Sequence, residues 1–510
     1  MRKIISWCCI ITLSLLAACS KDLGNYHYHD VNQVTIANFD TINGYSTFFN
    51  DTFNLSPKLV SSQNINNDTA YTYKWTYRLS SALSSVADSL LSTSKNLNVV
   101  VKLNPGNYTL MYKVTDKITG IEFHIKTILL VSTAVYEGYL VLSDVAGKSR
   151  LDMLSYNKPQ NIFTQYTDVL QQQGSTVPTN GQPLQVHCMV YTRTTVSTQN
   201  YGIFLLTTGN TNRINQETFS WLPTYDIRYL MVGSVPQGFT GVHLTGNYIN
   251  TNSSCTIYMY ASDGNMYCYS TNAGFAFRYI PQNVYSVNST PFRTTPWVAT
   301  DGTTGVYYDA DNRNFVVASA PGVAYVQKPA PALNYPTGYD LLWMDCNYYP
   351  EAGQVRTTYA VLQDPASGKK YLLRFKLGVA QDYFQEITGT DIASASHFTV
   401  SPDYGYLFYS AGGKVYEYDL ALKQSFLMVD KGSSVISYLS FLHIYDRYGN
   451  TNYVNWSKQL TVGSYDPAGT VGSNGTLEQY TIQPVNGQIT LSAQWTGFGN
   501  IVSTAYRARF

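Results

Sequence analysis

Four carboxylates gather in one stretch of the chain, and paired carboxylates are what glycoside cleavage requires. These are Asp340, Asp345, Glu351 and Asp364. A glycosidase needs two such groups facing one sugar, and a repeated β-fold can aim side chains toward a common point. Most acids here, however, stand beside predicted turns, where an Asp side chain stabilises its own backbone. A glycan hydrolase or lyase is therefore kept as an alternative, and no catalytic residue is assigned.

Other sequence motifs likewise assign no catalytic or metal-binding residue. The sequence has no evident Gly-x-Ser-x-Gly, His-Glu-x-x-His or Gly-x-Gly-x-x-Gly pattern. His27 and His29 have a spacing that can hold a metal on an extended strand, but no carboxylate or thiol cluster accompanies them. Asp309 and Asp311 suggest calcium, yet Arg313 takes the next alternating position, which favours turn stabilisation. We expect neither a metal nor a cofactor.

Aromatic residues in two segments are the best candidates for a binding site. Aromatic faces stack on sugar rings or peptide side chains, while the neighbouring Asn and Asp offer hydrogen bonds. The alternative is that many of these rings fill gaps inside the fold. The candidate ligand or partner contacts are Trp343, Tyr348, Tyr349, Tyr445, Tyr448, Tyr453 and Trp456.

The first nineteen residues carry a different kind of chemistry. Arg2 and Lys3 precede an apolar stretch over 4–18, which predicts a secretory signal and is too short to span a bilayer. The stretch ends in Leu-Ala-Ala-Cys, which resembles the lipobox of bacterial lipoproteins. The resemblance implies that signal peptide 1–18 is removed and that Cys19 receives lipid, which anchors the protein to a membrane. An ordinary cleaved signal with a chance cysteine is the alternative.

Composition limits the remaining choices. The 510 residues carry a formal net charge of +1, and only 13% are charged, so no clustered basic footprint for nucleic acid is evident. The 45 Tyr residues favour a β-rich structure. The four cysteines beyond Cys19 are expected to be buried thiols. A two-residue turn at Asp263-Gly264 would place Cys268 opposite Met259, too far from Cys255 for a disulfide.

Residues 19–33 are polar and are expected to form a lipidated tether, followed by a β-sandwich over 34–133. Strand-like runs separated by Gly, Pro and Asn turns predict the sandwich, and Trp75 has the neighbours of a core Trp in an immunoglobulin-like sheet. From Tyr108 to Thr115, apolar and polar residues alternate, which indicates one buried face. The stretch over 105–120 resembles the end of a PKD-type domain.

From 134 to 510 the chain repeats a hairpin signal. Seven hairpins begin near Tyr139, Ile203, Thr256, Gly305, Tyr359, Tyr406 and Leu460. A regularly repeated antiparallel unit is typical of a β-propeller, so we predict seven blades, with Asn500–Arg507 pairing with the first blade to close the ring. Two or more β-sandwiches in series are the alternative.

Three segments together resemble the PKD-like family lipoproteins of Bacteroidota. They are Cys19–Ile36, the PKD-type stretch and Glu137–Tyr156. The resemblance implies a lipid-anchored, surface-exposed outer-membrane protein that works beside a SusC/SusD-like uptake pair. Its partners would be that transporter pair and an oligosaccharide or peptide ligand. We therefore predict a non-catalytic binding or accessory subunit; a glycan-active enzyme and a purely structural subunit are the alternatives.

Overall fold

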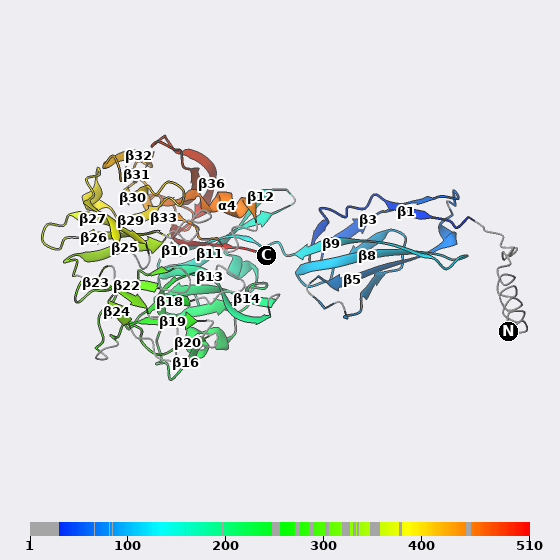
Figure 1. Cartoon of the computed structure of the whole chain (residues 1–510), viewed down its shortest axis with the longest axis horizontal. Helices are drawn as coiled ribbons and strands as arrows, with labels where there is room; N and C mark the ends of the chain where they lie inside the picture. The colour runs from blue at the N-terminus through cyan, green and yellow to red at the C-terminus, as the bar shows by residue number, and fades with distance from the viewer. Residues whose placement is uncertain are drawn as a thin grey trace, which may run out of the picture. The chain divides into compact units, whose positions relative to one another are not determined.

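The computed structural model describes residues 30–509 except for 66, 81, 84, 159, 196–197, 247–255, 271–275, 286–289, 301–304, 319–326, 330–332, 334–335, 347–356, 377–379 and 445–449. The chain divides into two compact units, one ending at Val131 and the other beginning at Ser132. Unit 1 is blue to cyan in Figure 1, and unit 2 runs from cyan to red. Among the described residues, no helix has the length and apolar character needed to cross a membrane.

Unit 1 is built from antiparallel strands in two layers. One layer is a five-stranded sheet in the order β2 (Tyr45–Phe48), β9 (Glu122–Ser132), β8 (Gly106–Asp116), β5 (Tyr71–Leu79), β6 (Ser89–Ser92). The other layer consists of two strand pairs, β1 (Val34–Ala37) with β4 (Lys58–Ser61) and β3 (Thr52–Leu55) with β7 (Leu97–Val100).

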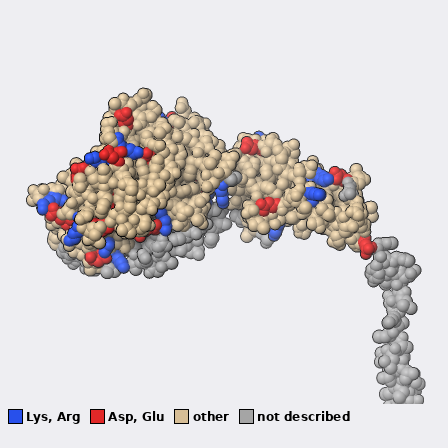
Figure 2. Space-filling model, turned by 90° about the horizontal axis from the view of Figure 1, so that it is seen from above, with Lys and Arg blue, Asp and Glu red and all other residues tan. Residues whose placement is uncertain are grey.

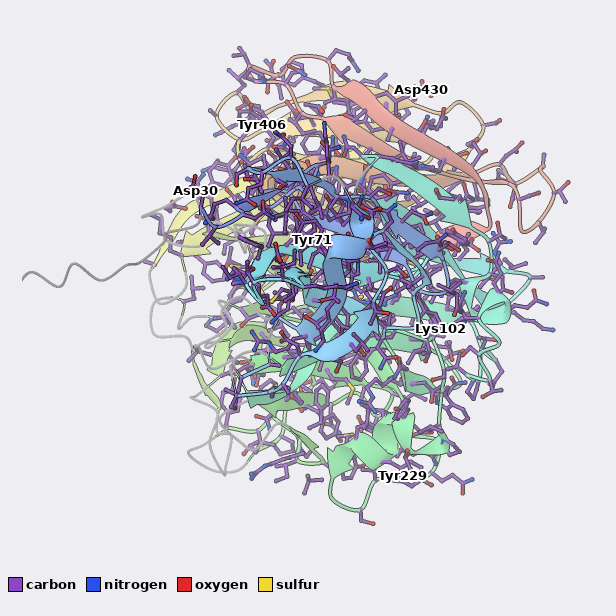
Figure 3. All side chains as sticks on the ribbon, turned by 90° about the vertical axis from the view of Figure 1, so that its right-hand side faces the viewer. Asp30, Tyr71, Lys102, Tyr229, Tyr406 and Asp430 are labelled. Atoms are coloured by element: carbon purple, nitrogen blue, oxygen red, sulfur yellow. The ribbon has the colours of Figure 1, made fainter. Side chains whose placement is uncertain are left out.

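The core of unit 1 forms between these layers, as the sequence alternation predicts. Along β8 every second residue is buried, from Tyr108 through Val114. Trp75 is fully buried, stacks on Tyr112 at a centroid distance of 4.2 Å, and its indole nitrogen donates to the Ser94 carbonyl at 2.9 Å. Tyr71, labelled in Figure 3, belongs to the same core. The predicted core role of Trp75 is confirmed.

Unit 2 contains seven sheets within the part of the chain that the structure describes, numbered here in chain order. Sheet 1 is β12 (Ile162–Tyr166), β11 (Lys148–Asn157), β10 (Gly138–Val145), β37 (Asn500–Arg507), and sheet 2 is β13 (Pro183–Thr195), β14 (Thr198–Thr207), β15 (Thr211–Ile214). Sheet 3 is β16 (Met231–Val232), β20 (Ala276–Arg278), β19 (Met266–Ser270), β18 (Thr256–Ala261), β17 (Gly241–Thr245).

The other four sheets have a uniform order of consecutive strands. Sheet 4 is β21 (Ala299–Thr300), β22 (Gly305–Asp309), β23 (Asn314–Ala318), β24 (Gln327–Pro329), and sheet 5 is β25 (Asp340–Cys346), β26 (Thr357–Gln363), β27 (Lys370–Lys376), β28 (Gln381–Glu386). Sheet 6 is β29 (His397–Val400), β30 (Leu407–Ala411), β31 (Lys414–Asp419), β32 (Gln424–Asp430), and sheet 7 is β33 (Val435–Phe441), β34 (Gln459–Tyr465), β35 (Gly475–Thr481), β36 (Thr490–Phe498). Short helices are α2 (Val169–Gln172), α3 (Ile227–Leu230) and α4 (Thr451–Ser457).

Six of the seven predicted hairpins are inner strand pairs of these described sheets, and in sheet 2 the hairpin is β14 paired with the edge strand β15. In sheet 6, for example, the predicted hairpin from Tyr406 is β30 paired with β31. Both strands are buried along most of their length because the sheets pack face to face. Phe408 of sheet 6 packs with Phe441 and Val462 of sheet 7, which shows one such interface. The fold of unit 2 is therefore all-β and propeller-like.

The last strand completes the first sheet. β37, red in Figure 1, pairs antiparallel with β10, as the sequence predicts. Glu137, just before β10, accepts hydrogen bonds from the Tyr453 hydroxyl at 2.5 Å and the Tyr506 hydroxyl at 2.7 Å. Arg507 is fully buried and donates to the Val135 carbonyl at 2.5 Å. Hydrogen bonds made by Arg507 and by the Glu137 carboxylate thus join the two ends of unit 2.

One predicted register is wrong by one residue. Cys268 lies opposite Tyr258 rather than Met259. The turn contains three residues between Ala261 and Asn265, with Gly264 at φ +79°, instead of a two-residue loop at Asp263-Gly264. This is the arrangement of a type I turn followed by a left-handed residue. Cys188, Cys268 and Cys346 are buried, as expected, and Cys255 lies outside the described residues.

Acidic and basic side chains are interspersed on the visible face of unit 2 (Figure 2).

The interior of unit 2 holds a buried carboxylate that has no cationic partner among the described residues. Glu417 on β31 is 0% exposed, and among the described residues neither of its carboxylate oxygens has a hydrogen-bond partner. Burial, with a smaller contribution from Asp419, raises the pKa of Glu417 to about 7. Ionisation of this group therefore opposes folding.

We expect Glu417→Gln to stabilise unit 2 at pH 8 by about 1–2 kcal/mol. At pH 4 both states of the wild type are protonated, so the advantage disappears there. In the wild type, Glu417 has a pKa of about 4.5 in the unfolded state and about 7 in the folded state. The loss of folding stability caused by its ionisation therefore develops as pH rises through this range. Denaturant unfolding at both pH values measures the difference in free energy of unfolding between the variant and the wild type. Glu122→Gln, at an exposed position, is the control. A variant no more stable than wild type at pH 8 would contradict the prediction.

Candidate binding cavity

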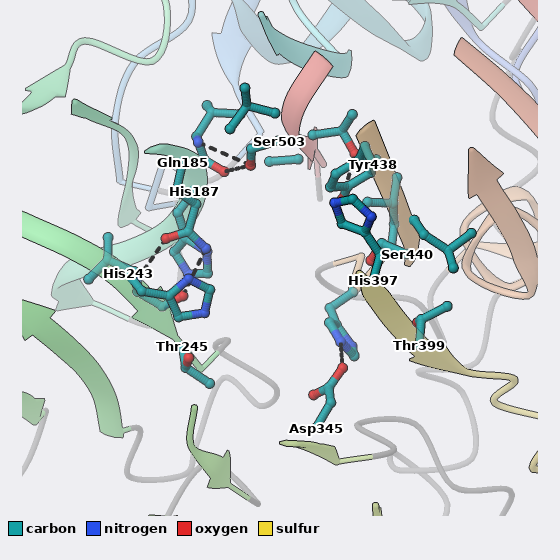
Figure 4. Close-up of a pocket in the computed structure, with 18 of the residues that line it drawn as sticks. Gln185, His187, His243, Thr245, Asp345, His397, Thr399, Tyr438, Ser440 and Ser503 are labelled. Carbon is teal, nitrogen blue, oxygen red and sulfur yellow. Dashed lines mark hydrogen bonds and ion pairs between the residues drawn. The ribbon is translucent and has the colours of Figure 1, made fainter. Parts of the chain in front are cut away.

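The sheets of unit 2 surround a cavity of about 430 Å³. Six of the seven sheets contribute the strand at their inner edge, and Trp297, just before β21, comes from the remaining one. The six strands are β37, β13, β17, β25, β29 and β33. Because strands from six different sheets converge here, residues far apart in sequence line one cavity (Figure 4).

Four histidines line this cavity. His187 lies on β13 and His243 on β17, on one side in Figure 4, whereas His397 lies on the opposite side at the start of β29. His443 follows β33. They are not arranged as a metal site: in the described part of the chain, no group of three or more His, Cys, Asp or Glu is placed to hold an ion.

Hydrogen bonds hold the walls in place. Gln185 donates to the Leu244 carbonyl at 3.0 Å and accepts from the Leu244 amide at 2.6 Å, which joins β13 to β17. The Ser503 hydroxyl accepts from the Val186 amide at 3.2 Å, which joins β37 to β13. The cavity is therefore framed before any ligand arrives, as ligand sites commonly are.

Burial keeps three of the four imidazoles neutral near pH 7. Burial lowers the pKa of His187 and of His243 to about 4, and it also lowers the pKa of His397. His187 Nε2 donates to the Gly246 carbonyl at 3.0 Å, which leaves its Nδ1 as an acceptor. His397 Nδ1 bonds the Ser410 hydroxyl at 2.9 Å, so Nε2 is its second polar atom.

One carboxylate reaches the cavity. His443 Nε2 donates to Asp345 Oδ2 at 3.2 Å, and Asp345 Oδ1 accepts from the Cys346 amide at 2.7 Å. Of the other carboxylates singled out in the sequence, Asp340 pairs with Arg313 and Asp364 caps its own turn. Glu351 lies outside the described residues. The described carboxylates of this stretch therefore do not converge on one point.

Besides the imidazoles, five aromatic rings of described residues line the walls: Trp297, Trp343, Phe398, Tyr438 and Tyr506. Trp297 contacts His243 edge-on, with ring centroids 5.3 Å apart. Trp343 lies 6.5 Å from Phe398, and both line the cavity. Trp343 is 6% exposed and also packs with Val361 and Leu407 between sheets 5 and 6. Its replacement by Ala would therefore leave a hole in the core as well as change the cavity wall.

The structure separates the predicted aromatic residues. Trp343 alone of the described ones lines the cavity. Tyr453 and Trp456 lie on helix α4 rather than in a loop: Tyr453 is 1% exposed and bonded to Glu137, and Trp456 packs against Tyr156 and Phe163. These two residues were predicted as ligand or partner contacts, and the structure instead packs them into the core where the ends of unit 2 meet. Cys19, Tyr348, Tyr349, Tyr445 and Tyr448 lie outside the described residues.

Sequence reasoning missed the histidines. Spacing along the chain shows no ligand pattern, because each histidine belongs to a different sheet. A signal was nevertheless present: all four precede one of the predicted hairpins, where the inner strand of the repeat should lie. Aligning the seven hairpins as repeats would have placed His187, His243 and His397 on equivalent strands.

Comparison with known proteins gives one family match. Residues 19–185 match the model of the PKD-like family, a range that covers unit 1 from residue 19 onward, β10 to β12 of unit 2 and the start of β13. No curated protein matches the chain significantly.

Several solved structures resemble it at low identity. One is a quinonprotein alcohol dehydrogenase-like protein from Bacteroides thetaiotaomicron (13% identity, TM-score 0.41, covering 94% of this chain and 99% of that one). Another, from Bacteroides fragilis, is provisionally named a 6-phosphogluconolactonase (11%, TM-score 0.44, 74% and 99%). At these scores the likenesses do not bear on activity. What the comparisons assign is a PKD-like segment over residues 19–185.

Proposed function

We propose that this protein is a surface lipoprotein, anchored through Cys19, that binds a ligand for a SusC/SusD-like uptake pair without chemical turnover. In this proposal unit 2 is a seven-bladed propeller, and its central cavity is the binding site. The observation that carries the proposal is the cavity itself: preformed, lined by hydrogen-bonding groups and aromatic rings, with one carboxylate already paired to a histidine. The family match over 19–185 and the signal with its cysteine support the lipoprotein part.

The proposal is tested on the mature protein together with its transporter pair. We expect it to co-purify with the pair from detergent-solubilised outer membranes. We also expect it to leave an offered oligosaccharide or peptide intact on prolonged incubation. Chromatography of the recovered ligand detects turnover. Formation of a product would overturn the assignment as a binding protein. Failure to co-purify with the transporter pair would overturn the assignment of that pair as the partner.

Lipidation is tested separately. Cells given labelled fatty acid should incorporate it into the wild-type protein, because Leu16-Ala17-Ala18-Cys19 ends the signal. Cys19→Ala should abolish incorporation and release the protein from the membrane fraction. Cys188→Ala, which alters a buried thiol in unit 2, serves as the control and should be labelled normally. Equal labelling of Cys19→Ala and wild type would contradict the assignment.

One observation favours an enzyme as the second candidate. The Asp345–His443 pair faces the cavity, and a carboxylate that orients an imidazole is an arrangement used for general-base catalysis. If the mature protein cleaves a glycan and Asp345→Asn lowers the rate by about 100-fold or more while binding persists, this candidate replaces the first.

A further inference from the structure

The cavity has an unusual charge balance. Its lining contains four histidines and one carboxylate, and no Lys or Arg among the described residues. His187 and His243 stay neutral near pH 7 because burial lowers their pKa to about 4. Asp345 is held by His443. Among the described lining residues, an anionic ligand thus finds no Lys or Arg to pair with, and a cationic ligand finds one carboxylate already bonded to His443.

We propose that the cavity binds an uncharged sugar unit, a mono- or disaccharide portion of a neutral glycan. This inference rests on the proposed binding function and specifies its ligand. Sugar hydroxyls both donate and accept, so they suit neutral imidazoles, whose two nitrogens differ in the same way. Burying a charged group that has no partner costs far more free energy than burying a hydroxyl group that is hydrogen-bonded. Uronic acids and peptide termini, which carry such charges, are therefore disfavoured as ligands.

The polar groups are distributed to meet such a ligand from several sides. His187 Nδ1 is an acceptor on one wall, and His397 Nε2 lies on the opposite wall. Among the described residues, His243 has no hydrogen-bond partner on either ring nitrogen, although it faces the cavity. Thr245 and Ser440 add hydroxyl groups to the lining. An unpartnered imidazole in a cavity wall is the kind of group that a ligand satisfies.

Shape and apolar surface agree with this chemistry. Trp297 and Trp343 border the cavity, and aromatic rings offer flat faces to the C–H side of a sugar ring. The volume of about 430 Å³ lies at the small end of the ~300–1,000 Å³ range of ligand sites. The cavity therefore fits the end of a glycan rather than a long internal stretch.

Calorimetric titration of the mature protein tests the inference. The probes are neutral disaccharides of glucose, galactose, mannose and xylose, with digalacturonate and glycylglycine for comparison. We expect at least one neutral disaccharide to bind and both charged probes to bind at least tenfold more weakly. His243→Leu should weaken neutral-sugar binding tenfold or more, because it removes both ring nitrogens without leaving a protein group unpaired. His124→Leu, on an exposed position of β9, is the matched control and should change nothing.

The outcomes separate this inference from the proposed function. Tighter binding of digalacturonate or glycylglycine, or neutral-sugar binding that His243→Leu does not affect, would overturn the sugar assignment alone. Absence of binding by every neutral disaccharide, with co-purification of the transporter pair retained, would also overturn only the sugar assignment. Loss of both binding and co-purification would overturn the proposed function as well.

Discussion

Deletion of residues 500–510 is expected to abolish the cooperative unfolding of unit 2. The deletion removes β37, which forms the inner edge of sheet 1 and pairs with β10. Ile501 and Tyr506 are buried. Burial of one large apolar side chain stabilises a fold by about 1.5–3 kcal/mol. Arg507 and the hydroxyl bonds to Glu137 are lost with the strand. The combined loss is comparable with the whole stability of a domain, about 5–15 kcal/mol.

Calorimetry and near-ultraviolet circular dichroism measure this loss. The transition of unit 1 is the internal control, because its core is composed of residues from Val34 to Val131. A synthetic peptide of residues 496–510, added to the truncated protein, should restore part of the unit 2 transition by supplying the missing strand. An unchanged melting transition in the truncated protein would show that the sheets do not depend on this closure.

Acidification is expected to destabilise unit 2 through the cavity histidines. Burial lowers the pKa of His187 and His243 to about 4 in the folded state, whereas an unfolded histidine titrates near 6.5. As pH falls from 6.5 to 4, the unfolded state takes up protons that the folded state does not, so stability is full above 6.5 and declines through this window. Because both rings face a cavity that water can enter, we expect about 2–4 kcal/mol for the pair.

The comparison of wild type with a double variant isolates this effect from the carboxylates. The variant combines His243→Leu with His187→Gln, whose amide can still donate to the Gly246 carbonyl. The free energy of unfolding, measured in denaturant at pH 7 and pH 4.5, should fall less in the variant than in the wild type. His124→Leu should follow the wild type. Equal pH dependence in wild type and double variant would contradict the pKa assignment.

Local pattern was sufficient for much of the fold. Alternation from Tyr108 to Thr115 predicted the buried face of β8, because side chains in a strand point to opposite faces in turn. The strand at Asn500–Arg507 was predicted to return to the first sheet, and it pairs with β10. In contrast, one additional residue in the turn after Ala261 moved Cys268 opposite Tyr258, since hairpin register follows loop length.

The candidate site depended on information that local pattern does not contain. Tyr453 and Trp456 have the composition of a binding loop, yet helix α4 buries Tyr453 against Glu137 from the opposite end of unit 2. Which side of an aromatic ring meets solvent depends on its neighbours in space, and those neighbours are 316 residues apart in this case.

The sequence by itself determined the all-β class and the seven hairpins, because each is written in neighbouring residues. Tertiary structure alone decided that His187, His243, His397 and His443 share one cavity. The physical reason is that each sheet contributes its inner strand to a common centre. Residues that are unrelated in sequence therefore become neighbours, and their shared burial sets the pKa values that keep the buried imidazoles neutral.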